Sequence, residues 1–462
     1  MASFTPADIL EAASAEVLAM PSASVFPSLS TDSRSPSPGA LFVALQGERF
    51  DAHAFLAEAA ARGAAGAVVR RGAGLPALPP GFGLFAVGDT LRALGALARF
   101  HRRRFRLPLG AVGGSNGKTT TKEMVGSILS VVGPALKTEG NLNNEVGLPL
   151  TLLRLTAGHR AAVVELGMNA PGEMGRLVAL AEPDAGVLTT IQPEHLEGLG
   201  SLAGVAAAEG ELFSGLAATA TAVVNLDEAL VVEQARASRA RWLTFGRDAG
   251  ADVRLEETRP LGRAGQQVVL RSDGRTFAVQ LGFLGAHNAL NAAAAFALAR
   301  GLGIPAEACA QGLALARPTA RRLSVVEAPG GLTVLDDCYN ANPASVRAAL
   351  QTARELAGPG RVVAVLGDML ELGPGEAEEH RQMVDVAFQL ATVRAFLGPR
   401  SWAAAPVQEA PESARFMEVE ALWDWLQPRL RPGDVVLVKG SRGMRMERLV
   451  ERLTGAAAAA GH

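Results

Sequence analysis

The sequence is poor in cysteine and carries almost no net charge. Its 462 residues include only two cysteines, Cys309 and Cys338, which are far apart and lack the spacing of a metal site. A disulfide framework is therefore not expected, and we predict a reducing, cytoplasmic location. The formal net charge is −2, so the composition indicates neither a nucleic-acid partner nor an anionic membrane surface.

Long apolar runs are also missing. No stretch approaches the roughly 18 uninterrupted apolar residues of a transmembrane helix, so we expect no membrane insertion. The first residues lack a basic segment followed by an apolar one, and we expect no signal peptide. Nearly half of the residues are nevertheless apolar. A chain of this length then predicts about three domains of roughly 100–200 residues.

Lysine is rare as well, because the basic residues are almost all arginine. The only four lysines are Lys118, Lys122, Lys137 and Lys439. A sequence that avoids lysine is expected to keep it where a compact ammonium group is needed. Two of the four lie in motifs described below, although a biased genome composition also explains the general preference for arginine.

Short apolar runs predict an α/β protein with three parts. Residues 1–84 contain two candidate strands and a candidate helix, which predict a small α/β domain. Residues 85–317 alternate apolar runs with helical patterns, as parallel βαβ units do, and predict a central nucleotide-binding domain. Within it, residues 251–283 predict antiparallel strands. Residues 318–462 predict a second open sheet, in which ligands bind beyond the carboxyl ends of the strands.

A glycine-rich loop follows one apolar run and opens a helix. It reads Gly113-Gly114-Ser115-Asn116-Gly117-Lys118-Thr119-Thr120-Thr121. Backbone N–H groups of such a loop bind phosphate, helped by the positive end of the helix. We expect Lys118 to reach the β- and γ-phosphates and the Thr119 hydroxyl to bind Mg²⁺. A plain glycine turn is the alternative, but it would not require Lys-Thr.

Two more candidates follow predicted strands. Glu165 ends an apolar run at 161–166, where a carboxylate can bind a hard cation attached to phosphate. An ordinary glutamate at a strand end is the alternative. His195 lies just past the predicted strand 185–191, and a single histidine is usually structural.

Several longer segments resemble the Mur ligase family in their order and spacing, over nearly the whole chain. They are Thr31–Arg34, Pro38–Ala44, Gly114–Thr120, Gly140–Pro149, Asp336–Pro343, Gly367–Gly373 and Val438–Arg442. The segments 140–149 and 336–343 resemble in particular the branch that adds D-alanyl-D-alanine to the muramoyl tripeptide of bacterial cell-wall synthesis.

The resemblance implies three domains: one for a uridine nucleotide, one for ATP, and a Rossmann-like domain that closes over the site. It implies an ATP-dependent ligase that joins D-alanyl-D-alanine to UDP-N-acetylmuramoyl-tripeptide through an acyl phosphate. ATP and Mg²⁺ would be the cofactors, the two substrates the partners, and the protein a monomer.

Family roles can be placed on matching positions. Thr119 and Glu165 look like ligands of the ATP-bound Mg²⁺, and His195 looks like a ligand of a second Mg²⁺. The residues that look like further ATP contacts are Asn288, Asn291, Arg322 and Asp337. Those that look like substrate contacts are Ser33, Arg34, Asn141, Asn143, Asn144, Tyr339, Asn340, Asn342, Asp368, Lys439 and Arg442. Among the substrate contacts, Asp368, Lys439 and Arg442 look like those of the dipeptide, although a structural ion pair explains them as well. The alternative for the helix of Asn288 is simple packing.

One position departs from the family pattern. The family usually has a lysine, carbamoylated by CO₂, shortly after the His195 segment, and Glu209 occupies the aligned position. We hypothesise that Glu209 supplies the equivalent anion at the second Mg²⁺, directly or through a water, so that Lys118, Glu165, His195 and Glu209 carry the chemistry. The alternative is a glutamate on a solvated helix face. A smaller departure is Arg321, since glycine usually precedes the position of Arg322.

Two other functions fit part of the pattern. One is another amide ligase of the superfamily, such as a folylpolyglutamate synthase. The other is a P-loop regulatory ATPase or kinase that forms no amide. The segments 140–149 and 336–343 argue against the first, and the additional N-terminal and C-terminal domains argue against the second.

Overall fold

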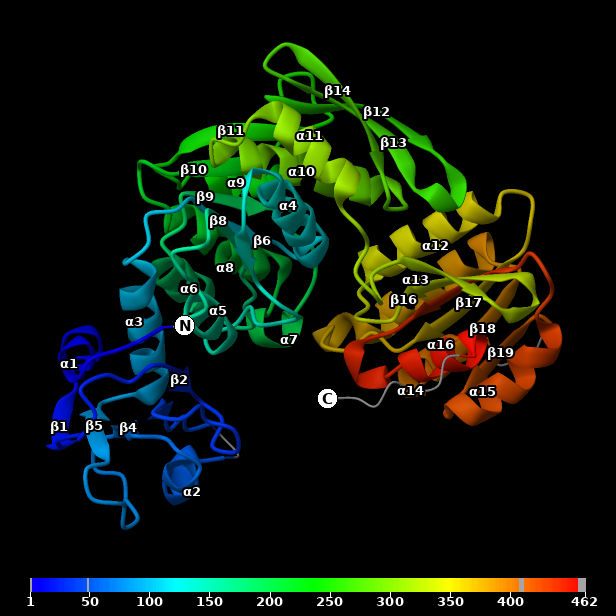
Figure 1. Cartoon of the computed structure of the whole chain (residues 1–462). Helices are drawn as coiled ribbons and strands as arrows, with labels where there is room; N and C mark the ends of the chain where they lie inside the picture. The colour runs from blue at the N-terminus through cyan, green and yellow to red at the C-terminus, as the bar shows by residue number, and fades with distance from the viewer. Residues whose placement is uncertain (1, 48–49, 407–410, 456–462) are drawn as a thin grey trace. The chain divides into compact units, whose positions relative to one another are not determined.

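The computed structural model describes residues 2–47, 50–406 and 411–455 (Figure 1). Helices and strands alternate, and the strands form three sheets of five, nine and six strands, which confirms the predicted α/β class. The chain divides into two compact units. The first comprises Met1–Ala111, Gly133–Gly167 and Glu173–Asp184, and the second comprises Val112–Val132, Met168–Gly172 and Ala185–His462. In the described part of the chain, no helix has the length and apolar character needed to cross a membrane.

The five-stranded sheet belongs to the first unit and has the order β1-β5-β4-β3-β2. Its strands are β1 (Glu16–Ala19), β2 (Leu29–Ser30), β3 (Leu41–Val43), β4 (Gly66–Arg70) and β5 (Gly83–Val87). The helical segments around it are α1 (Pro6–Ala13), η1 (Ala52–Phe55), α2 (Leu56–Ala61) and α3 (Thr90–Arg102). All pairs are parallel except β1 with β5. The buried side chains of β3 and β4 form its core.

The nine-stranded sheet has the order β14-β13-β12-β11-β10-β9-β6-β8-β7. Its strands are β6 (Leu109–Gly113), β7 (Ala135–Lys137), β8 (Ala161–Glu165), β9 (Ala185–Leu188), β10 (Thr221–Asn225), β11 (Arg241–Gly246), β12 (Val253–Pro260), β13 (Gln266–Ser272) and β14 (Arg275–Leu281). Strand β13 pairs antiparallel with both β12 and β14, as the sequence predicted for 251–283.

The helices between these strands bring polar loop residues to the strand ends. They are α4 (Lys118–Val132), α5 (Gly147–Leu152), α6 (Glu173–Ala181), α7 (Leu196–Leu199), α8 (Leu202–Ser214), α9 (Ala229–Ala235), η2 (Gly262–Ala264), α10 (Ala286–Gly301) and α11 (Ala306–Leu315). Helix α10 is buried along most of its length and packs against α4 and strands β10 to β12. Its alanines allow this close approach because they carry no bulky side chain.

The six-stranded sheet, with the helices around it, is called the C-terminal region below. Its order is β15-β16-β20-β17-β18-β19, and only β15 is antiparallel to its neighbour. The strands are β15 (Ser324–Ala328), β16 (Leu332–Asp337), β17 (Val362–Gly367), β18 (Val393–Leu397), β19 (Ser413–Phe416) and β20 (Val435–Lys439). The helical segments are η3 (Pro329–Gly331), α12 (Pro343–Ala357), η4 (Gly373–Gly375), α13 (Glu376–Leu390), α14 (Pro399–Ala404), α15 (Val419–Leu426), η5 (Gln427–Arg429), η6 (Arg442–Met444) and α16 (Glu447–Thr454).

Both faces of this last sheet are covered. On β17, Ala364 and Leu366 belong to a core cluster with residues of α12 and α13. Val363 and Val365 point to the other face and join a cluster with residues of α15 and α16. A strand buried on both faces is expected to be apolar throughout, which is why its run is so clear in the sequence.

Two predicted elements differ from those observed. The candidate helix of the region 1–84, predicted for residues 52–61, begins as a 3₁₀ turn, Ala52–Phe55, and continues as α2, since Asp51 caps the turn by accepting from the His53 N–H. The predicted strand 185–191 ends at Leu188. Residues 189–191 leave the strand, and Thr189 and Thr190 form hydrogen bonds with the glycine-rich loop instead.

Candidate active site

The glycine-rich loop lies between β6 and α4, as predicted. Gly114 and Gly117 have φ angles of +111° and +86°, which residues with a Cβ rarely adopt. A Cβ on Gly114 would lie 2.3 Å from Thr189 Oγ1, and one on Gly117 would lie 2.3 Å from Asn291 Oδ1. Both glycines are therefore required by close neighbours, and Asn291 of α10 stands directly beside the loop.

Residues that follow β9 hold the loop in place. The Ser115 N–H donates to Thr190 O (2.8 Å), and Thr189 Oγ1 donates to Asn116 O (2.6 Å). The Gln192 N–H donates to Ser115 Oγ (2.8 Å). These contacts fix the backbone conformation that a phosphate group would meet. Thr189, Thr190 and Gln192 were not predicted as site residues, because the predicted strand extended to residue 191; two polar threonines at its end were a usable signal of an earlier end.

Lys118 opens α4 and turns its side chain back over the loop. Its Nζ donates to Gly114 O (2.5 Å) and lies 3.4 Å from Glu194 Oε1. The ammonium group therefore lies against carbonyl groups of the loop and beside the carboxylate of Glu194. Glu194, next to His195, was not predicted as a site residue.

Glu209 points from α8 to the same loop. Its side chain is only 1% exposed, and Oε2 accepts a hydrogen bond from the Gly114 N–H (2.8 Å). Burial raises the pKa of Glu209 to about 7, and the positive charge of Lys118 opposes that increase. The alternative of a solvated glutamate is therefore wrong, because this side of α8 faces the loop and also carries the buried residues Val205 and Leu212. Its role at a metal stays a prediction.

Glu165 ends β8 in a buried position, only 3% exposed. Oε1 accepts from Asn143 Nδ2 (2.9 Å), whereas the buried Oε2 has no hydrogen-bond partner among the described residues. A buried carboxylate oxygen without a partner is costly unless a cation neutralises it. This arrangement fits the predicted Mg²⁺ ligand.

Histidine, cysteine and carboxylate side chains alone do not form a metal site: residues 2–47, 50–406 and 411–455 hold no group of three or more that could bind an ion. A magnesium ion would therefore need hydroxyl, phosphate or water oxygens as well, which are ligands that it normally takes.

His195 lies just before α7 with a φ of 50°, and its Nδ1 is 2.7 Å from Glu371 Oε2. Glu371 comes from the C-terminal region. Glu371 was not predicted as a site residue, although it lies within the segment 367–373.

Arg322 also joins the C-terminal region to the loop. Its Nη2 donates to Thr119 Oγ1 (3.2 Å), and its guanidinium carbon lies 3.8 Å from the centre of the Tyr339 ring. The flanking residues Arg321 and Leu323 have φ angles of 64° and 53°. Such backbone strain is typical of functional sites. It also explains why glycine suits the position of Arg321.

A second link is an amide pair. Asn342 Nδ2 donates to Asn116 Oδ1 (2.9 Å), and Asn342 also caps α12 by accepting from the Ser345 N–H. A residue of the predicted substrate segment thus contacts the phosphate loop itself.

Other predicted residues support the site from within. Asp337 accepts from Lys439 Nζ (2.6 Å) and from the Leu323 N–H (3.0 Å). Lys439 also donates to Asn340 O (2.9 Å). The structure therefore shows a buried Lys439 paired with a partly buried Asp337 next to the Arg322 segment, and a direct contact of either with a ligand stays a prediction.

Asp368 is buried, and its Oδ1 accepts from the Ser401 N–H (2.8 Å) at the start of α14. Arg442, in contrast, is exposed and pairs with Glu447 at 3.2 Å. Of the three residues predicted for the dipeptide, Arg442 is thus the accessible one.

The amide residues elsewhere form two local networks. On α10, Asn291 Nδ2 donates to Asn288 Oδ1 (2.9 Å). In the segment 140–149, Asn144 Oδ1 accepts from the Gly147 N–H (2.9 Å) at the start of α5, and Asn141 is exposed.

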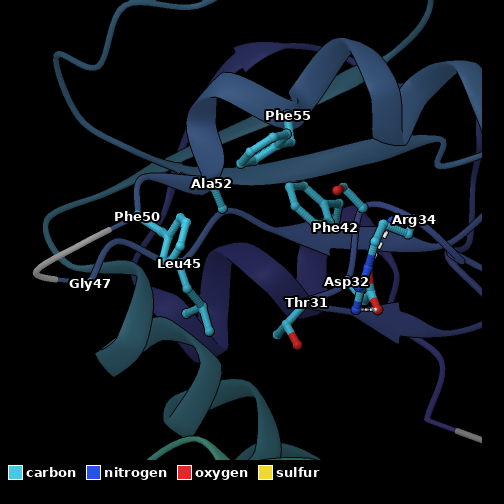
Figure 2. A pocket seen from close by; sticks show the side chains of 10 residues that line it. Thr31, Asp32, Arg34, Phe42, Leu45, Gly47, Phe50, Ala52 and Phe55 are labelled. Atoms are coloured by element: carbon cyan, nitrogen blue, oxygen red, sulfur yellow. Dashed lines mark hydrogen bonds and ion pairs between the residues drawn. The ribbon is translucent and has the colours of Figure 1, made fainter. Parts of the chain in front are cut away.

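A pocket of about 690 Å³ opens in the first unit (Figure 2). Ser33 and Arg34 line it together with the aromatic rings of Phe42, Phe50 and Phe55. Arg34 donates three hydrogen bonds of 2.9 Å to Asp32, two from its side chain and one from its backbone N–H, and they lower the pKa of Asp32 to about 2. The pocket has the size and the mixed lining of a small-molecule site.

These features define a class of protein: an α/β enzyme that binds phosphate on a strand–loop–helix motif and contacts that motif with a Rossmann-like region. Residues 112–299 match the family description "Mur ligase middle domain", and residues 321–442 match "Mur ligase, glutamate ligase domain".

Similar proteins are known along the whole chain. The UDP-N-acetylmuramoyl-tripeptide–D-alanyl-D-alanine ligase of Escherichia coli (strain K12) is 39% identical over 430 residues, which are 92% of this chain and 93% of that protein. The crystal structure of MurF from Acinetobacter baumannii is 32% identical and superposes with a TM-score of 0.89 over 98% of this chain and 99% of that one. MurF ligase from Thermotoga maritima in complex with ADP is 28% identical, with a TM-score of 0.83 over 93% and 97% of the two chains. The chain belongs to the Mur ligase family.

Proposed function

We propose that this protein joins D-alanyl-D-alanine to UDP-N-acetylmuramoyl-tripeptide at the expense of ATP, giving the pentapeptide precursor, ADP and phosphate. The observation that carries the proposal is the 39% identity to a ligase of this name over more than nine-tenths of both chains. The complex of the Thermotoga maritima relative with ADP supports the use of ATP.

The chemistry follows from the low reactivity of a carboxylate toward an amine in water. Transfer of the γ-phosphoryl group of ATP to the tripeptide carboxylate gives an acyl phosphate with a good leaving group. The dipeptide amine then attacks the acyl carbon, the amide bond forms, and phosphate leaves. Phosphoryl transfer depends mainly on positioning and charge neutralisation. The backbone N–H groups of the loop and Lys118 would position the phosphates and neutralise their charge. Arg322 would contribute a further positive charge from the C-terminal region.

Thr119 and Glu165 would hold a Mg²⁺ ion, which neutralises phosphate charge when bound. The unpartnered Oε2 of Glu165 supports this role. His195 and Glu209 would serve a second Mg²⁺, with Glu209 in place of the carbamoylated lysine of the family. The burial of Glu209 against the phosphate loop supports the second assignment.

The pocket beside Ser33 and Arg34 would bind the uridine nucleotide, because aromatic rings suit a base and Arg34 suits a phosphate. Asn141, Asn143 and Asn144 would face the tripeptide. Arg442 would face the dipeptide, with Asp368 and Lys439 behind it. The proposed domains are 1–84, 85–317 and 318–462. The family matches at 112–299 and 321–442 fall inside the second and third. A cytoplasmic monomer without a nucleic-acid partner stays a prediction.

Phosphate release from ATP tests the proposal when each acceptor is omitted in turn. We expect release with both the UDP-linked tripeptide and D-alanyl-D-alanine present, together with a product whose mass shows the added dipeptide. The Lys118→Met variant should lower kcat by about 10²–10³-fold, the usual effect of removing one group that stabilises transition-state charge. Release that ignores the dipeptide and yields no coupled product would indicate a regulatory ATPase. Coupling of glutamate instead would indicate a folylpolyglutamate-type ligase.

A further inference from the structure

A histidine–carboxylate pair joins two segments that lie 176 residues apart in the sequence. His195 Nδ1 and Glu371 Oε2 are 2.7 Å apart. Both residues have left-handed backbones, with φ angles of 50° and 64°. Two strained non-glycine residues in direct contact indicate a geometry maintained for its side chains, because strain of this kind persists only where the surroundings impose it.

The segment that carries Glu371 is fixed on both sides. Before it, the Met369 N–H donates to His380 Nε2 (3.0 Å), and the Leu370 N–H donates to Ser441 Oγ (2.9 Å). After it, Gly373 lies against α7, since a Cβ added there would be 3.6 Å from Leu196 Cβ. The position of the carboxylate therefore follows from the backbone of both segments.

The contact determines which ring nitrogen carries the proton. An ionised carboxylate only accepts hydrogen bonds, so Nδ1 must donate, and a neutral ring then leaves the lone pair of Nε2 free. Carboxylates that orient a functional histidine in this way are common, and their loss typically costs roughly 10–100-fold in activity or metal affinity.

We propose that Glu371 is a positioning residue, which holds His195 in its Nδ1–H form and presents Nε2 to the reacting phosphates or to their Mg²⁺. The inference rests on the proposed function. Because Glu371 belongs to the C-terminal region and His195 to the segment after β9, contact between these two parts prepares the histidine for the reaction. The pair is partly exposed, at 25% and 60% for the two side chains. Exposed ion pairs contribute little to the free energy of unfolding, so stability alone does not explain why His195 and Glu371 are paired.

The Glu371→Ala and Glu371→Gly variants test the proposal, and the glycine variant removes the carboxylate without keeping a side chain at a positive φ. Both should lower kcat by about 10–100-fold while the melting temperature stays near that of the parent. The tautomer gives a readout without turnover. ¹⁵N spectra are recorded for the nucleotide-free parent and variants at about pH 8.5, where free histidine is neutral. The His195 signals should be those of the Nδ1–H form in the parent and those of the Nε2–H form in both Glu371 variants. A His195→Gln variant assigns these signals.

A matched control is Glu327→Ala. Glu327 of β15 pairs with Arg263 at 2.7 Å and is similarly exposed, but it lies outside the candidate site. It should leave both kcat and the His195 spectrum unchanged. Variants of Glu371 that keep parental kcat, or that keep the Nδ1–H signal, would overturn the inference. If the parent enzyme couples no dipeptide, the proposed function is refuted. The tautomer of His195 in the parent and in the Glu371 variants then still decides whether Glu371 positions the histidine.

Discussion

At the scale of single residues, the phosphate loop depends on two glycines that have different neighbours. Gly114 borders the residues after β9, whereas Gly117 borders Asn291 of α10. The second contact links the loop to the helix predicted to meet the nucleotide. The close contact between Gly117 and Asn291 can be tested by adding one methyl group at position 117.

The Gly117→Ala variant should weaken nucleotide binding by at least about tenfold and destabilise the protein by about 2–4 kcal/mol. The reason is the left-handed backbone, which costs roughly 1–2 kcal/mol with a Cβ, together with the clash with Asn291. Calorimetric titration with ADP and thermal unfolding measure the two effects. Gly303→Ala is the control, because Gly303 has a similar φ of +83° and nothing within 4 Å of an added Cβ. Equal losses in both variants would show that the clash is unimportant.

Glu209 gives a second test at this scale. If it replaces a carbamoylated lysine, the parent should work equally well with and without added bicarbonate. Glu209→Ala should lose about 10–100-fold of activity, as expected for a group that supports a metal ligand, and bicarbonate should not restore it. Steady-state rates in CO₂-depleted buffer measure both effects. Strong bicarbonate activation of the parent, or normal activity of the variant, would count against the assignment.

At the scale of elements, one carboxylate ties two helices of the first unit together. Glu182 directly follows α6, and its Oε1 accepts from Arg103 Nη2 (2.5 Å) and Arg99 Nη2 (2.6 Å) of α3. The helices approach closely there, since a Cβ on Gly95 would lie 3.0 Å from Leu180 Cδ2. The hydrogen bonds from Arg103, supported by those from Arg99, lower the pKa of Glu182 from 4.5 to about 2.

This pKa predicts how the contribution to stability depends on pH. The folded value lies below the unfolded one, so the contribution is complete above about pH 4.5 and is lost as pH falls toward 2. Glu182→Gln should therefore lower the melting temperature at pH 7, and the difference from the parent should shrink between pH 4.5 and pH 3. Calorimetry across that range measures it. Glu139→Gln, which removes one exposed pair with Arg154, should cost less at pH 7. A difference that stays constant with pH would contradict the assigned cause.

At the scale of the whole molecule, the C-terminal region contacts the phosphate loop through Asn342 and Arg322, and it contacts the segment after β9 through Glu371. Each contact reaches a residue with a different expected role: Asn116 in the loop, Thr119 at the phosphates, and His195 beyond β9. If the reaction needs these three contacts, removing the two partners of a contact should change kcat/KM in a non-additive way.

A double-mutant cycle on Asn116 and Asn342 measures one of them. Asn342→Ala also removes the cap of α12, which typically costs about 1 kcal/mol, but the cycle cancels that effect. We expect a coupling energy of about 0.5–1.5 kcal/mol in kcat/KM for ATP, the size of a typical net hydrogen bond. Additive effects of the two substitutions would show that the amide pair plays no part in turnover.

The sequence by itself determined the elements whose cause is local. A strand, two glycines at positive φ and a helix start lie within a dozen residues, so the loop from 113 to 121 was recognisable without any partner. Strands such as β17 were clear because burial on both faces requires an apolar run. The position of Glu165 at the end of β8 could be predicted because it is also a local property, whereas its role at a metal stays a prediction.

Only the tertiary structure decided which distant side chains meet. The sequence left Glu209 either at the site or in solvent, and the facing of α8 toward Gly114 settled that choice. It gave no reason to pair His195 with Glu371 or Asn116 with Asn342, since hydrogen bonds of about 3 Å depend on how segments far apart in the chain pack. The same dependence made Asp368 a buried cap and Lys439 the buried partner of Asp337. Local backbone conformation depends on residues that are neighbours in the sequence and can therefore be predicted from it. Side-chain pairing between distant segments is determined only when the sheets and helices pack together.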